Sequence, residues 1–226
     1  MGAAIKIDNL TKTFVKDGLK IEVLKGINFT VSAGESLAVA GVSGAGKSTL
    51  IHIIGALDRP TSGSVLVDGV DVFNWEEKKL ARFRNEKIGF IFQFFNLLPE
   101  FTSLENTMMP ALLQGKSRRE AKERAEIILN EVGLGDRMNH QPGELSGGEQ
   151  QRVAVARALI MKPDIILADE PTGNLDRSTG VKIEDILVNL NKTREVTLIV
   201  VTHNKSLADK MSRSIGLGDG RICASE

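Results

Sequence analysis

The eight residues from Gly41 to Ser48 constrain the fold of this chain more than any other segment. They read Gly-Val-Ser-Gly-Ala-Gly-Lys-Ser and match G-x-x-x-x-G-K-[ST] at every fixed position. The apolar run Ser36–Ala40 leads into them, and Lys47–Leu57 follows with apolar residues at helical spacing. A glycine-rich turn between a strand and a helix points backbone N–H groups at phosphate. The pattern therefore predicts a phosphate-binding loop in an α/β domain.

Residues of this loop have separate expected roles. Lys47 would reach the outer phosphates of a nucleotide, and the Ser48 hydroxyl would contact Mg²⁺. We therefore expect ATP and Mg²⁺ as ligands. The remaining residues expected to bind nucleotide here are Gly41, Ser43, Gly44, Ala45, Gly46 and Thr49.

Two adjacent carboxylates, Asp169 and Glu170, follow the apolar run Ile165–Ala168. Ligands of open α/β sheets bind at the carboxyl ends of the strands, which is where this run ends. Asp169 suits the Mg²⁺ shell, either directly or through a water. Glu170, pointing the other way by strand alternation, is expected to orient the attacking water as a general base. Without the phosphate loop, a solvated acidic turn would explain the pair about as well.

Ser146, Gly147 and Gly148 precede a predicted helix from Glu149 to Met161. A helix N-terminus binds anions, so these residues form a second candidate phosphate site. Ser146 also fits the N-cap position, with Glu149 completing a capping box. The two roles are compatible, because a capped helix still carries its positive dipole end.

Composition excludes several classes of function. The 226 residues carry 29 Lys and Arg against 29 Asp and Glu, so no basic excess points to nucleic acid as a partner. One cysteine, Cys223, permits no intrachain disulfide and fits a reducing compartment. No run approaches the ~20 apolar residues that span a bilayer. If the protein serves a membrane, we expect it to do so through a partner.

Strand and helix patterns alternate along most of the chain, which predicts a mostly parallel sheet with helices on both faces. Early alternating segments and a hairpin signal at Asp68-Gly69 predict an antiparallel β part. The stretch Phe94–Gly143 departs from the pattern and contains two helical segments, Leu104–Leu113 and Arg118–Val132. We expect one domain over residues 1–226, with a core at 1–93 and 144–226 and an inserted helical subdomain at 94–143.

The order of these motifs resembles the nucleotide-binding subunits of ABC transporters. The loop, Gln93, Leu145–Gln150, Asp169-Glu170, Asp176 and His203 stand in that family's order, and the resemblance runs from Ile5 to Ile222. It implies a P-loop NTPase of the ABC type that hydrolyses ATP. It also implies a head-to-tail dimer, in which Ser146, Gly147 and Gly148 of one copy close over the ATP held by Lys47 of the other.

The resemblance further implies roles for single residues. Gln93 would touch the metal and the lytic water, His203 would contact the γ-phosphate, and Asp176 would link the two sites of the dimer. The expected catalytic residues are thus Glu170, His203 and Gln93, and the expected metal ligands are Ser48, Gln93 and Asp169. Phe14 fits adenine stacking and ordinary core packing equally well.

Within the family, Phe94–Asn106 and the Asp169–Asp176 sequence D-E-P-T-G-N-L-D most resemble ATP-binding subunits of bacterial lipoprotein-releasing systems. This implies a peripheral protein on the cytoplasmic side of the inner membrane, with its 94–143 lobe on membrane-spanning subunits. Related macrolide-efflux and cell-division complexes share Asp169–Asp176 and stay as alternatives. One departure is Asn204, where relatives often carry Asp, and we expect no effect of it on the chemistry.

Other function classes fit less well. ABC-type ATPases that act on DNA or ribosomes usually carry long coiled-coil insertions or two nucleotide domains. A GTPase would need an Asp after Asn191-Lys192-Thr193, where this chain has Arg194. A regulatory module that binds ATP without cleaving it would not need Glu170 and His203.

Overall fold

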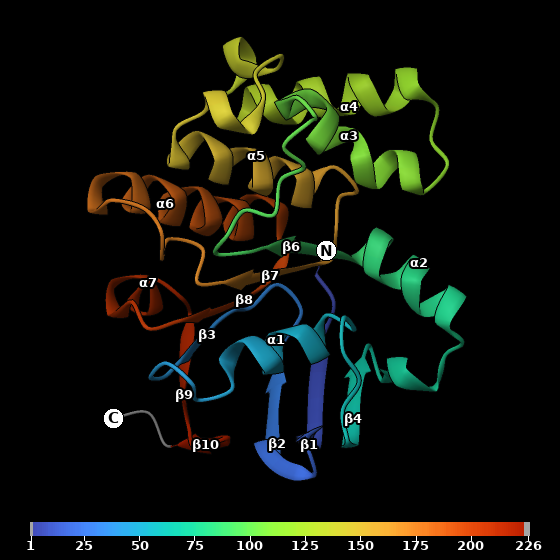
Figure 1. The fold of residues 1–226 in the computed structure, drawn as a ribbon, viewed down its shortest axis with the longest axis vertical. Coiled ribbons are helices and arrows are strands. Elements are labelled where there is room, and N and C mark those ends of the chain that lie inside the picture. Colours follow the sequence, from blue (N-terminus) through green and yellow to red (C-terminus); the bar gives the residue numbers. More distant parts are fainter. Residues whose placement is uncertain (1, 224–226) are drawn as a thin grey trace.

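A six-stranded sheet forms the centre of the molecule in the computed structural model, which describes residues 2–223 (Figure 1). Its strand order is β10-β9-β3-β8-β7-β6, and all neighbours run parallel except β10 and β9. The strands are β3 (Ser36–Ala40), β6 (Ile88–Ile91), β7 (Ile165–Asp169), β8 (Thr197–Thr202), β9 (Arg213–Gly218) and β10 (Arg221–Cys223). The predicted mostly parallel core is confirmed, although the sequence patterns did not indicate β9 and β10.

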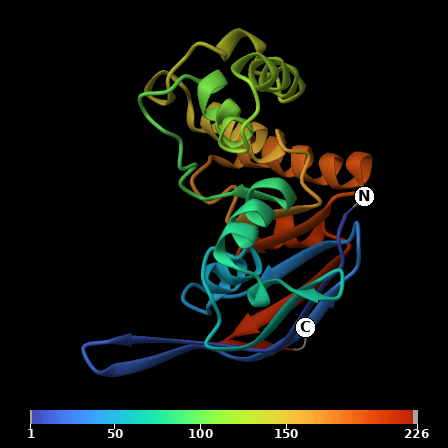
Figure 2. The same cartoon turned by 90° about the vertical axis from the view of Figure 1, so that its right-hand side faces the viewer.

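A second, antiparallel sheet has the order β2-β1-β4-β5 and confirms the predicted antiparallel β part. Its strands are β1 (Ile5–Lys16), β2 (Leu19–Val31), β4 (Ser62–Val67) and β5 (Val70–Asp71). The β4–β5 turn places Asp68 at φ 49° and Gly69 at φ 80°, as the hairpin signal predicts. β1 extends well past the predicted Leu10, and its hairpin with β2 projects away from the body of the molecule (Figure 2).

Helices cover both faces of the central sheet (Figure 1). α1 ends three residues before the predicted Leu57, because Ala56 takes a left-handed conformation at φ 55°. Helices α2 and α7 were not predicted, and three short 3₁₀ turns, η1 to η3, complete the elements of residues 2–223. The elements are α1 (Lys47–Ile54), α2 (Glu77–Lys87), α3 (Ser103–Leu113), α4 (Arg118–Glu131), α5 (Gly147–Leu159), α6 (Arg177–Arg194), α7 (Lys205–Asp209), η1 (Val72–Asn74), η2 (Gly135–Arg137) and η3 (Pro142–Glu144).

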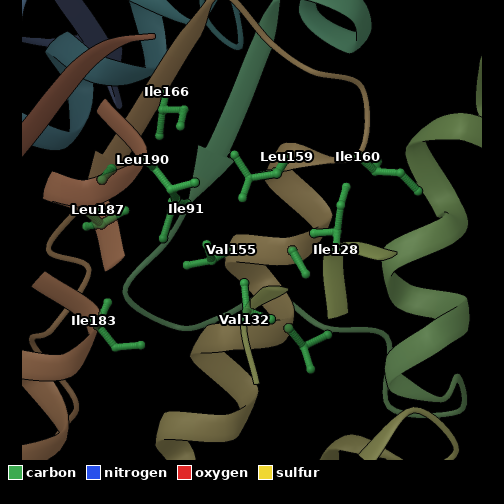
Figure 3. Packing of buried hydrophobic residues seen from close by; sticks show 14 of the residues in the cluster. Ile91, Ile128, Val132, Val155, Leu159, Ile160, Ile166, Ile183, Leu187 and Leu190 are labelled. Carbon is green, nitrogen blue, oxygen red and sulfur yellow. The ribbon is translucent and has the colours of Figure 1, made fainter. Parts of the chain in front are cut away.

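Two hydrophobic cores lie on opposite faces of the sheet, because successive strand residues point to opposite sides. On one face, Ile91 and Ile166 pack with α5 and α6, and Val132 and Ile128 bring the α3–α4 region into the same core (Figure 3). On the other face, Ile165 packs with α1 and the antiparallel sheet. The helical stretch therefore packs on the sheet through α5 and shares its core. No helix among residues 2–223 is long and apolar enough to cross a membrane.

Candidate functional site

A cleft of about 560 Å³ opens at the carboxyl ends of the central strands. It is bordered by the loop before α1, by the ends of β6 and β7, and by the residue that follows β8. The lining residues are Val23, Val42, Ser43, Gly44, Gly46, Lys47, Ser48, Thr49, Gln93, Glu170 and His203. The fold therefore brings six of the predicted nucleotide-binding residues and all three predicted catalytic residues to one place.

The loop backbone needs glycine at defined positions. Gly44 and Gly46 have φ of 82° and 99°, which L side chains rarely adopt. At Gly41 the constraint is close packing, since an added Cβ would lie 2.2 Å from the Leu217 carbonyl oxygen on β9. Open space surrounds the Cβ position of Gly44, so the mouth of the loop stays accessible to a ligand.

Lys47 is the first residue of α1 and is 7% exposed. Its Nζ donates to the carbonyl oxygens of Gly41 at 2.8 Å and Val42 at 3.1 Å. The same Nζ lies 3.6 Å from Glu170 Oε1. The loop therefore holds a buried positive charge within ion-pair distance of the predicted general base.

Glu170 follows β7 and does not continue its alternation, so the predicted reason for its direction is wrong. Its φ of 44° turns the chain into the left-handed region, and its side chain points to β8. Oε2 accepts from the Thr202 hydroxyl at 3.0 Å and from the His203 N–H at 3.2 Å, and Oε1 lies 2.8 Å from His203 Nδ1. Contacts with the neighbouring strand end thus determine the position of this carboxylate.

Asp169 has the properties of a cation ligand. Oδ1 is buried and has no hydrogen-bond partner among residues 2–223. Burial raises the pKa of Asp169, while a hydrogen bond with Ser48 acts in the opposite direction. A buried oxygen without a partner costs free energy that a bound cation or its water would recover. Ser48 and Asp169 therefore fit the Mg²⁺ that the loop pattern predicts.

Gln93 follows β6 and is hydrogen-bonded to Asn174, which lies in the loop after Glu170. Its Nε2 donates to Asn174 Oδ1 at 3.2 Å, and Asn174 Nδ2 donates to the Gln93 carbonyl oxygen at 3.0 Å. A side chain at Gly173 would be blocked, since its Cβ would lie 2.9 Å from Gln93 Nε2. The Gln93 amide is thus held at the edge of the cleft.

Eight predicted site residues do not line the cleft of their own chain: Phe14, Gly41, Ala45, Ser146, Gly147, Gly148, Asp169 and Asp176. Ser146, Gly147 and Gly148 begin α5, where Ser146 and Glu149 form the expected capping box. Asp176 caps α6 and accepts from the N–H groups of Ser178 and Thr179. Phe14 is 41% exposed on the projecting hairpin, with Lys12 Nζ 4.8 Å from its ring centroid. Predicted Ala45 is buried beneath the loop.

Sequence reasoning missed three residues of the site. Thr202 holds Glu170, and its position at the end of an apolar strand was an available signal. Asn174 holds Gln93 and could have been inferred only from their contact in space. Val23 reaches the cleft from β2, which no local pattern indicates.

Comparison with known proteins agrees with this geometry. The family model described as ABC transporter matches residues 24–173. The lipoprotein-releasing system ATP-binding protein LolD of Syntrophus aciditrophicus (strain SB) is 69% identical over 218 residues, which cover 96% of this chain and 98% of that protein.

Two solved structures of the cassette MJ0796 are also similar. Its dimeric structure is 44% identical, with a TM-score of 0.90 over 96% of each chain. Its dimeric post-hydrolysis state, bound to ADP and Pi, is 42% identical, with a TM-score of 0.91 over 98% of this chain and 97% of that one. The chain therefore belongs to the ABC transporter family and is an ATP-binding, ATP-hydrolysing member of it.

Proposed function

We propose that this chain powers the release of lipoproteins from the bacterial inner membrane toward the outer membrane, as a peripheral subunit on the cytoplasmic side. The observation that carries the proposal is the 69% identity, over nearly the whole of both chains, to a protein named for lipoprotein release. The sequence of Leu97–Asn106 supports the same choice over macrolide efflux and cell division, whereas Asp169–Asp176 is common to all three.

Before hydrolysis, the Lys47 ammonium would exchange the Glu170 carboxylate for phosphate oxygens of the nucleotide. Its Nζ lies 3.6 Å from Glu170 Oε1 in a poorly hydrated site, where two charges attract strongly. Phosphate oxygens entering the loop would compete with Glu170 for this cation. Glu170 would then accept a proton from the attacking water, held in place by Thr202 and His203.

Ser48, Asp169 and Gln93 are the residues that would hold Mg²⁺, and the ion would neutralise charge that develops on the transferred phosphoryl group. His203 has one ring nitrogen on Glu170, which orients the imidazole. Its side chain is 65% exposed, so the other ring nitrogen is accessible to a γ-phosphate.

A second copy would complete the site. Ser146, Gly147 and Gly148 lie outside the cleft of their own chain, although the first turn of α5 offers N–H groups with no partner inside the helix. Supplied by another copy, this turn would contact the γ-phosphate from the open side. The dimeric MJ0796 structures support such an arrangement.

A groove of about 400 Å³ between α2, α3 and α5 is the proposed docking place for the membrane-spanning subunit. Its lining is mainly apolar, with Leu113 on its edge at 76% exposure and Leu57 at 49%. Burying such surface is favourable by roughly 25 cal/mol per Å². We assign the groove to a short apolar cytoplasmic segment of that subunit.

The groove is connected to the cleft by the chain that follows β6. Phe92 and Asn96 line the groove, and Gln93 between them lines the cleft. The Arg157 guanidinium holds this segment by donating to the carbonyl oxygens of Phe95 and Asn96. A partner that displaces the segment would therefore move Gln93. Phe95 is itself half-buried near Gly147, so its substitution would also disturb α5.

The test combines co-purification with transport. Leu113→Glu and Leu57→Glu, which both change the lining of the groove, should lose the membrane subunits and lipoprotein release from proteoliposomes, while basal ATPase of the isolated chain stays within about twofold. Ile127→Glu is the matched control, because Ile127 is 60% exposed on α4 and does not line the groove. Release by the two groove variants would contradict the docking assignment. Transport of a macrolide by the wild-type complex, without lipoprotein release, would contradict the proposed cargo.

A further inference from the structure

A chain of hydrogen bonds extends behind Glu170 and His203 to the interior of α6, and Asn204 lies at its centre. Asn204 Oδ1 caps α7 by accepting from the N–H groups of Ser206 at 2.9 Å and Leu207 at 3.4 Å. Its Nδ2 donates to Glu184 Oε1 at 3.0 Å. Asn204 therefore uses one side-chain oxygen as an acceptor and one nitrogen as a donor, which a carboxylate cannot do.

Glu184 is the anchor of this chain of bonds. It lies on α6 and is 2% exposed, an unusual location for a carboxylate. Lys210 balances its charge, with Nζ 2.9 Å from Glu184 Oε2 and 2.9 Å from the exposed Asp185 Oδ1. Removing any partner of a buried charge is costly, so Glu184 holds the Asn204 amide firmly.

From Asn204 the bonds continue to the cleft. The Asn204 N–H donates to Thr202 Oγ1 at 3.0 Å, and this hydroxyl donates in turn to Glu170 Oε2 at 3.0 Å. His203, between these two residues, contacts both oxygens of Glu170. A shift of Asn204 would therefore move the Thr202 hydroxyl and the imidazole together.

We propose that Asn204, anchored by Glu184, is a positioning residue for Glu170 and His203. The inference rests on the proposed roles of those two residues in hydrolysis. It also changes the expectation that the departure from Asp at this position has no effect. Beside a buried Glu184, an Asp would place two carboxylates against each other and remove the donor, so this chain requires the amide.

The experiment first places a carboxylate at position 204 and then an amide at position 184, so that the two groups are exchanged. Asn204→Asp should lower kcat about 10-fold, within the range of coupling energies between contacting residues, while the Kd for MgATP changes less than about twofold. Adding Glu184→Gln should restore kcat to within about threefold, because the new amide at position 184 can donate to the new carboxylate at 204. Asn189→Asp on the exposed face of α6 is the matched control and should leave kcat unchanged.

A purely structural role would give a different result. It would lower thermal stability and MgATP affinity together with kcat, and that pattern would overturn the inference, as would a double variant that stays impaired. If Asn204→Asp does not fold, Thr202→Val decides, since it removes the hydroxyl that joins the Asn204 N–H to Glu170. In that variant kcat must fall about 10-fold with unchanged Kd, and wild-type kcat would refute the network.

Glu170→Gln separates failure of the inference from failure of the proposed function. An inactive Glu170→Gln beside a fully active Asn204→Asp would remove the positioning role and leave the catalytic assignment intact. A fully active Glu170→Gln would remove the catalytic assignment on which the inference stands.

Discussion

The starts of α1 and α5 both contain or adjoin glycine and serine, but the structure completes these two helix ends differently. At the start of α1, the Nζ of buried Lys47 lies 3.6 Å from Glu170 Oε1, and Asp169 Oδ1 has no hydrogen-bond partner in the described chain. Before α5, the Ser146 hydroxyl and Glu149 satisfy each other. The start of α1 therefore fits a charged ligand that binds in the cleft of the same chain. The start of α5 is capped by its own side chains and does not line the cleft, so its use as a phosphate site requires another molecule.

The largest effect should come from Glu170→Gln, which keeps the size of the side chain but removes its proton acceptance. Loss of a general base costs about 10²–10⁴-fold in rate, so kcat should fall by that factor. MgATP should bind equally well or more tightly, since the competing carboxylate beside Lys47 becomes neutral. Steady-state ATPase and equilibrium titration measure the two quantities. Wild-type turnover would end the case for Glu170.

Lys47→Ala tests the loop itself. Losing a charge-assisted contact to phosphate should weaken MgATP binding about 10–100-fold. Lys182→Ala, an exposed lysine on α6, is the control and should bind normally. Because Lys47 also balances Glu170, thermal unfolding should be recorded for both variants. Equal affinity of a folded Lys47→Ala protein would contradict the loop assignment.

Ser146→Ala should separate the two helix ends. In the Glu170→Gln background, the monomer should bind MgATP as before, but ATP-dependent dimerisation on a sizing column should weaken, with ADP giving no dimer in either protein. Loss of the N-cap should also lower the free energy of unfolding by about 1 kcal/mol. If the monomer itself loses ATP affinity, then the start of α5 acts within its own chain and the comparison fails.

The smallest expected effect is a pH dependence of the α5 cap. Hydrogen bonds from the Ser146 hydroxyl and N–H, and then Arg137, lower the pKa of Glu149 to about 2. Since folding lowers this pKa, the contribution to stability is complete above about pH 4.3 and is lost as the pH falls toward 2.

Urea unfolding of wild type and Glu149→Gln between pH 3 and 6 measures this contribution. The difference in unfolding free energy should be about 1 kcal/mol at pH 6 and should shrink toward pH 3. Glu123→Gln, an exposed position on α4, is the control and should give a flat difference. A difference for Glu149→Gln that does not depend on pH would contradict the capping role of its charge.

Elements built from local patterns were predicted well. β3 and β7 are short apolar runs, and their positions match the prediction because each is buried on both faces. The helices α4 and α5 were located to within two residues by their apolar spacing. β9 and α2 were missed, since Arg213–Gly218 contains little apolar alternation and Glu77–Lys87 is mostly charged.

The candidate site likewise divides into residues that local patterns indicate and contacts that depend on the fold. Lys47, Ser48, Asp169 and Glu170 could be identified from spacing, because their motifs depend on neighbours in the chain. The direction of Glu170 could not be, since it is decided by Thr202 and His203, which are 32 and 33 residues away. The expectation that Asn204 has no effect on the chemistry likewise missed its contact with Glu184, which no local pattern indicates.

Patterns among neighbouring residues were sufficient to predict the fold class, the loop and the candidate reactive groups, because periodicity and motif spacing are local properties of the chain. Which groups meet depends on the folded chain: Lys47 with Glu170, Asn204 with Glu184, and the end of β6 with both the cleft and the α2–α3–α5 groove. These contacts arise when parallel strands bring their carboxyl ends to one edge of a sheet. Their partners depend on strand order and on backbone turns such as that at Glu170, which residue spacing does not encode.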